Sequence, residues 1–263
     1  MSASNGTNHL GVNLGFTKFL FVAPRVSDDA TLGRIKGVAA MVARGYFNDY
    51  ESEGSREAPT QDTIQFFTST CPADGTCARA RYAVQIASKY RPRLQETEAE
   101  FRKRFAGDAD VTALDGALRN PHYTSAELHA YAYKNACPRP SARQSQTVII
   151  IPMRKTPEWW SKSALERHTY FYPHLDHETL ENVPGHAQVA EAGISTIFRR
   201  LYYNPDGHSR DGEFDFITYF ECADAHLPVF DEICRRLRDV TKNPEWRFVV
   251  EGQEWRGRRV LRW

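Results

Sequence analysis

The sequence has no apolar run long enough to span a bilayer. Apolar runs such as Val148–Pro152 are far shorter than the roughly 20 residues that a membrane helix needs. No positively charged segment followed by an apolar one opens the chain, so we expect a cytoplasmic protein with no membrane partner. An excess of one charge is also missing, since 34 basic and 33 acidic residues leave a net charge of +1. This balance argues against nucleic acid as the main partner.

Cysteine is scarce, and several common catalytic motifs are absent. Five cysteines are too few for a disulfide scaffold in 263 residues, and their number is odd. Cys71 and Cys77 have no second pair at the spacing of zinc ligands, so we expect five reduced thiols. The chain has no Walker loop, no GxGxxG after a strand, no GxSxG and no HExxH. Phosphate-binding, dinucleotide-binding and zinc-hydrolase functions are therefore unsupported.

Tryptophan is unevenly placed in a chain of otherwise ordinary globular composition. Hydrophobic residues make up 41% of the sequence and charged residues 25%. All five tryptophans, however, lie between Trp159 and Trp263. The C-terminal half therefore differs from the N-terminal half, which indicates two units with different roles.

The first half predicts the element order β-α-β-β-α-β of a ferredoxin-like unit. Hydrophobic spacing and capping signals predict strands over Gly15–Ala23, Thr63–Thr70, Ala78–Ala87 and Val111–Leu118, a helix over Ala30–Arg44 capped by Asp28 or Asp29, and a helix from Pro92 to near Phe105.

The same order recurs after a proline-containing linker at Asn135–Gln146. It comprises strands over Thr147–Met153, Gly193–Tyr203, Phe214–Cys222 and Trp246–Val250, a helix over Ser161–Pro173 with Ser163 as a possible cap, and a helix over His226–Val240. We therefore predict an α+β protein of two tandem ferredoxin-like units, over residues 11–140 and 147–263.

A cluster of basic, histidine and aromatic residues in the second half could carry chemistry. It comprises KTPEWW at Lys155–Trp160, the histidines His168, His174, His177 and His186, IFRRLYYN at Ile197–Asn204 and DFITYFE at Asp215–Glu221. A structural role is open for it, because tryptophans anchor packed units and a buried arginine usually pairs with a carboxylate. Arg199 and Arg200 point to opposite faces of their strand, so at least one of them faces inward.

The motifs VIIIPMRKTPEWW, FRRLYYN and DFITYFE, in this order and with a histidine-bearing helix after the first, resemble the chlorite dismutase family of haem enzymes. The resemblance is close over about Thr147–Phe248 and looser over the first half. It implies the dimeric α+β barrel fold with two ferredoxin-like units in one chain. It also implies haem b in the C-terminal unit and a ring-shaped homo-oligomer, with a homopentamer favoured.

The resemblance assigns four residues to the periphery of the haem. Trp159 and Trp160 match a tryptophan pair that lines the haem and steadies the subunit contact. Lys155 matches a basic residue near the haem propionates, where an ammonium offsets carboxylate charge. Tyr123, in RNPHYT, matches a tyrosine that bonds a propionate.

It also assigns residues to the two sides of the iron. Arg199 and Phe220 match distal residues, and Glu245 matches the carboxylate that accepts the other N–H of the proximal histidine. Two histidines compete for the proximal position: counting forward from the tryptophan pair gives His174, and counting back from Arg199 gives His186. The two counts differ because about a dozen extra residues lie between these anchors. We prefer His186, because the chain runs from it without a gap into the strand of Arg199.

Two residues favour one reaction among those of the family. Coproheme decarboxylases carry a tyrosine immediately before the proline of a YPM-like strand end, whereas this sequence has Ile151, which cannot donate a proton. Arg199 suits a small oxyanion substrate, because a guanidinium offers a charged fork of donors. The resemblance therefore implies an oxidoreductase that converts chlorite to chloride and dioxygen. The alternatives are a relative with peroxidase or coproheme decarboxylase-like activity, and a non-catalytic haem binder.

Overall fold

The computed structural model describes residues 13–50, 61–70, 80–119, 136–140, 146–176, 180–207 and 213–263. In the first half, the elements are β1 (Gly15–Pro24), α1 (Asp29–Val42), β2 (Phe47–Asn48), β3 (Thr63–Ser69), β4 (Tyr82–Ser88), α2 (Arg91–Phe105) and β5 (Ala109–Leu118). The six predicted elements are confirmed, although β4 begins at Tyr82 instead of Ala78, and β2 is an addition. Asp28 caps α1 by accepting the backbone N–H of Thr31 at 2.6 Å, and Pro92 lies in the first turn of α2.

In the second half, the elements are β6 (Gln146–Lys155), α4 (Pro157–Ser161), α5 (Ala164–Thr169), β7 (His174–Leu175), β8 (Asn182–Val183), α6 (Gly185–Ala190), β9 (Ile197–Tyr203), β10 (Phe216–Ala223), α7 (Leu227–Leu237), β11 (Val249–Glu251) and β12 (Trp255–Val260). The repeated strand–helix order is confirmed, but three predicted boundaries are wrong.

Each wrong boundary has a local cause. The helix predicted over Ser161–Pro173 is confirmed only over α5, because Ser163 starts α5 through a capping box with Glu166 and the helix ends at Thr169; Ser161 is the last residue of α4. The strand predicted from Gly193 begins at Ile197, since Glu191–Gly193 forms a 3-10 turn. The strand predicted from Trp246 begins at Val249, because Pro244 opens a 3-10 helix that runs to Phe248. The helix α6 and the strand β12 had no predicted counterpart.

The strands form a closed barrel. Among the described residues, neighbouring strands pair in the order β10-β9-β5-β1-β4-β3-β12-β6, and β6 pairs back to β10, so the ring has no free edge. Every pairing in this ring is antiparallel. The pairs β5–β9 and β3–β12 join the two halves, so both ferredoxin-like units share one sheet. The domain limits 11–140 and 147–263 stay a prediction.

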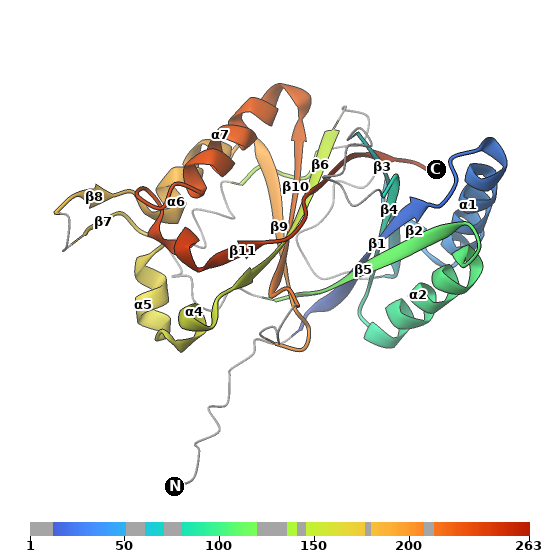
Figure 1. The fold of residues 1–263 in the computed structure, drawn as a ribbon, viewed down its shortest axis with the longest axis horizontal. Helices are drawn as coiled ribbons and strands as arrows, with labels where there is room; N and C mark the ends of the chain where they lie inside the picture. Colours follow the sequence, from blue (N-terminus) through green and yellow to red (C-terminus); the bar gives the residue numbers. More distant parts are fainter. Residues whose placement is uncertain are drawn as a thin grey trace, which may run out of the picture.

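Helices cover opposite sides of the barrel (Figure 1). Side chains that include Phe19, Phe67 and Tyr219 fill its interior. The helices α1 and α2 pack on the first half over a separate core around Ile35, and α7 packs on β6, β9 and β10 through residues such as Phe230. Within the described part of the chain, no helix is both long and apolar enough to cross a bilayer.

Candidate functional site

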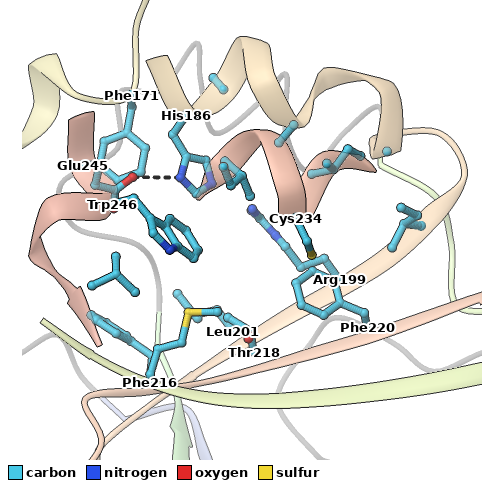
Figure 2. A pocket seen from close by; sticks show the side chains of 18 of the residues that line it. Phe171, His186, Arg199, Leu201, Phe216, Thr218, Phe220, Cys234, Glu245 and Trp246 are labelled. Carbon is cyan, nitrogen blue, oxygen red and sulfur yellow. Dashed lines mark hydrogen bonds and ion pairs between the residues drawn. The ribbon is translucent and has the colours of Figure 1, made fainter. Parts of the chain in front are cut away.

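A pocket of about 230 Å³ separates the helices α6 and α7 from the sheet of the second half (Figure 2). One wall is a strand surface with side chains at alternating positions of β9 and β10. These are Arg199, Leu201 and Tyr203 on β9, and Phe216, Thr218 and Phe220 on β10. Phe220 lies opposite Arg199 in the strand register, and Figure 2 shows both at one end of this wall. The strand wall thus presents one guanidinium among mainly apolar side chains.

The other wall is helical and includes small residues. His186, Ala187 and Ala190 come from α6, followed by Gly193, and α7 contributes Phe230, Ile233, Cys234 and Leu237 at helical spacing. Burial raises the pKa of the Cys234 thiol to about 12, so this side chain is a neutral thiol at neutral pH. His186 is therefore the nitrogen donor of this wall, and no thiolate competes with it.

A hydrogen-bonded carboxylate fixes the orientation of His186. The Nδ1 atom of His186 lies 2.8 Å from Oε2 of Glu245 (Figure 2). An ionised carboxylate can only accept, so Nδ1 carries the proton and donates it to this bond. In the neutral imidazole, the lone pair then lies on the second ring nitrogen, Nε2. A neutral imidazole in this tautomer is the form that binds a metal ion.

Lys155 holds the carboxylate in its charged form. Its ammonium donates to Oε1 of Glu245 and lies 4.2 Å from the ring centroid of Trp159. Burial alone would raise the pKa of Glu245, but Lys155 and His186 outweigh it and lower this pKa from 4.5 to about 2. Burial lowers the pKa of Lys155 itself. Glu245 is therefore a buried anion at any ordinary pH.

The extra residues between the two sequence anchors form a self-contained hairpin. The strands β7 and β8 pair through His174 with Val183 and Leu175 with Asn182. The chain returns to where it left, because a Cβ on Gly185 would lie 2.4 Å from the carbonyl oxygen of Tyr172. Gly185 has a φ of +72°, which favours glycine.

This hairpin explains the two conflicting histidine counts. The hairpin carries His174 away from the pocket, and its Nδ1 contacts the carbonyl of Tyr172 at 2.9 Å. His186 follows the hairpin and lines the pocket. The segment that follows α5 holds the first turn of α6 in place, since the N–H of His186 donates to the carbonyl of Tyr170 and the N–H of Ala187 to that of Phe171, both at 3.1 Å. His174 is thus not among the pocket residues.

The tryptophan pair lies beside the pocket and not in its lining. Trp159 is buried against Tyr170 and Phe248, with ring centroids 5.5 and 5.6 Å away. Trp160 packs on Phe216, which does line the pocket, and its Nε1 donates to Asp215 at 3.3 Å. Trp160 therefore packs against the pocket wall through Phe216, and Trp159 contacts the lining through Lys155.

Of the other predicted site residues, Arg199, Phe220, Glu245 and Lys155 line the pocket. Lys155 donates to Glu245, the partner of His186, whereas the sequence predicted that Lys155 would lie near the carboxylates of the ligand. Tyr123 lies outside the described residues.

Several pocket residues were missed from the sequence. Alternation along the strands of Arg199 and Phe220 would have identified Leu201, Tyr203, Phe216 and Thr218. Trp246 carried no comparable signal, because it lies in a 3-10 helix that was expected to be a strand.

Comparisons with known proteins agree with this fold. No protein-family model matches the chain. Solved structures of chlorite dismutase from Candidatus Nitrospira defluvii do match. The complex with imidazole is 17% identical, with 94% of this chain and 92% of that chain covered and a TM-score of 0.63. A mutant with an arginine replaced by glutamate is 17% identical, with 95% and 93% covered and a TM-score of 0.65.

The predicted resemblance to chlorite dismutases is therefore confirmed at the level of the fold. This α+β chain has the architecture of those structures over nearly its whole length. A sequence identity of 17% supports a shared fold but does not show a shared activity, so the activity must be inferred from the residues of the pocket.

Proposed function

We propose that this protein is a haem b oxidoreductase that converts chlorite to chloride and dioxygen. One observation carries the proposal: His186, with its carboxylate partner, and Arg199 line opposite walls of a single pocket. An imidazole that would hold iron on one side and a fixed cation on the other would suit iron-centred chemistry on a small oxyanion.

The donor set fits a haem better than a free metal ion. Within the described part of the chain, no group of three or more His, Cys, Asp or Glu residues could hold a metal ion. A single imidazole with a free Nε2 suits an iron whose other ligands come from a macrocycle. The small residues Ala187, Ala190 and Gly193 leave room for a flat group against the helical wall.

Each pocket residue then has a definite task. His186 would hold the iron, and Glu245 would strengthen its donation through the Nδ1 bond. Lys155 keeps Glu245 ionised. Arg199 would attract chlorite and keep the chlorine-containing fragment inside the pocket. When bound, haem iron supplies the transfer of an oxygen atom from chlorite and its return to form dioxygen. The apolar lining excludes water from this exchange.

The alternative reactions have weaker support. Ile151 is buried in the core under α7, so the position of the decarboxylase tyrosine holds a packing residue. Among the described residues of the strand wall there is no histidine, so peroxide activation would lack the usual acid–base group. Chlorite conversion therefore remains the proposal.

The partners and the location are proposed on the resemblance alone. A small oxyanion is the substrate we expect, the assembly we expect is a homopentamer, and the location is cytoplasmic. Mass determination of the purified protein in solution would check the pentamer, and a monomer would contradict it.

Oxygen release from chlorite tests the function. Protein reconstituted with haem b should evolve one dioxygen per chlorite consumed, recorded with an oxygen electrode. Haem-free protein and the His186→Ala variant treated with haem are the controls, and both should give none. A haem-loaded protein that leaves chlorite intact would overturn the proposed reaction while leaving haem binding in place.

A further inference from the structure

One buried cation in the described residues has no carboxylate partner. Four cationic side chains are buried, namely Lys18, Arg119, Arg139 and Arg259. Three of these make ion pairs within 4.0 Å: Lys18 with Glu98 and Asp115, Arg139 with Glu221 and Asp49, and Arg259 with Glu221. Arg119 makes none with any described residue, although it is only 6% exposed. A buried charge of this kind is costly unless something neutralises it.

The contacts of Arg119 leave part of its guanidinium open. Its Nε donates to the side-chain oxygen of Asn13, and its Nη2 donates to the carbonyl of Pro205 at 3.0 Å. Its Nη1 donates to no described residue. A nearby carboxylate, Asp206, forms a two-pronged pair with Arg91, with both distances 2.6 Å. Burial lowers the pKa of Arg119, though a guanidinium stays charged.

Arg119 lies at the edge of the pocket. It follows β5 directly, and Ala117 of β5 pairs with Tyr203 of β9. The guanidinium carbon lies 6.0 Å from the centroid of the Tyr203 ring, and Tyr203 lines the pocket. Arg119 therefore lies next to a residue of the pocket lining, although it does not itself line the pocket. Lys155, a cation that does line the pocket, is already paired with Glu245.

We infer that Arg119 is an anion-binding residue of the pocket that neutralises a carboxylate of its ligand. The inference rests on the proposed function, because haem b carries two propionates that need such partners. A planar fork of donors matches a carboxylate, and the surrounding protein has already removed the guanidinium from water. The carboxylate of the ligand would thus be the ion-pair partner that the described residues do not provide for Arg119.

Comparing haem b with its dimethyl ester tests this inference, because the ester has the same ring and iron but no carboxylates. The measurement is the ratio of the two dissociation constants, from titrations followed by absorbance. We expect wild type to bind the acid more tightly, and Arg119→Gln to reduce this preference by roughly tenfold, the effect of one charge-assisted hydrogen bond. Arg119→Lys should keep part of the preference and protects the test if the glutamine variant fails to fold.

Arg34→Gln is the control, because Arg34 pairs with Asp108 and neither of these described residues lines the pocket or contacts Arg119. It should keep the full preference. An unchanged preference in Arg119→Gln would overturn the inference, and would indicate that Arg119 serves a free anion or none. A wild-type chain that binds neither form of haem would overturn the proposed function, and this inference with it.

Discussion

Replacing Glu245 by glutamine removes the charge that connects Lys155 to His186, while the shape of the side chain is kept. In the folded protein the pKa of Glu245 falls from 4.5 to about 2. At about 1.4 kcal/mol per pKa unit, this shift corresponds to a stabilisation on the order of 3 kcal/mol. The variant also leaves the ammonium of Lys155 buried without its partner, which typically costs about 3–5 kcal/mol. Both estimates predict a large loss of stability.

Urea unfolding of the haem-free protein at pH 7 measures this loss. Glu245→Gln should be less stable than wild type by about 3 kcal/mol or more, a large share of a typical folding free energy. Adding Lys155→Met should restore much of it, because no buried charge is then left alone. Glu232→Gln, at an exposed pair with Arg235, is the control and should leave the unfolding midpoint unchanged. A Glu245→Gln protein within about 1 kcal/mol of wild type would refute the reasoning.

Three further outcomes follow from the same geometry. The contribution of Glu245 should be complete above pH 4.5 and fade as the pH falls toward 2, because folding lowers its pKa; acid unfolding of wild type and Glu245→Gln should therefore converge at low pH. The Arg199→Ala variant should keep the haem spectrum, but its oxygen yield should fall and its haem should bleach faster. Arg199→Lys should recover part of the oxygen yield. An Arg199→Ala protein that is destabilised but has normal turnover per haem would show that Arg199 has a structural role instead. Gly185→Ala should weaken haem binding more than Gly33→Ala, because a Cβ on residue 185 would clash with Tyr172, whereas a Cβ on residue 33 meets nothing within 4 Å. Equal haem affinities of the two variants would contradict the role of Gly185 in positioning His186.

The fold could be predicted because it rests on repeated local patterns. Alternation identified β1 and β4, and the same period of two, with Phe220 opposite Arg199 in the register of β10 and β9, places both residues on one face of the sheet. The closing of the barrel could not be predicted in this way, since the single register pair between Ala117 and Tyr203 depends on contacts distant in sequence.

The residues around His186 were harder to place for a different reason. His186 lies on a six-residue helix that has no capping side chain, so no local sequence signal predicts this helix. Its position depends on a hairpin that leaves and returns at Tyr172 and Gly185, which only a three-dimensional contact reveals. The partnership of Lys155 with Glu245 spans 90 positions in sequence and likewise has no local signature.

Haem titration of three proteins tests the central claim, that His186 is the iron ligand, most directly. Wild type, His186→Ala and His174→Ala would be titrated with haem b while the Soret band is recorded. We expect His174→Ala to match wild type and His186→Ala to lose the band or shift it strongly, because only His186 lines the pocket with Glu245 on its Nδ1. Loss of binding in His174→Ala, with normal binding in His186→Ala, would contradict the assignment of the site.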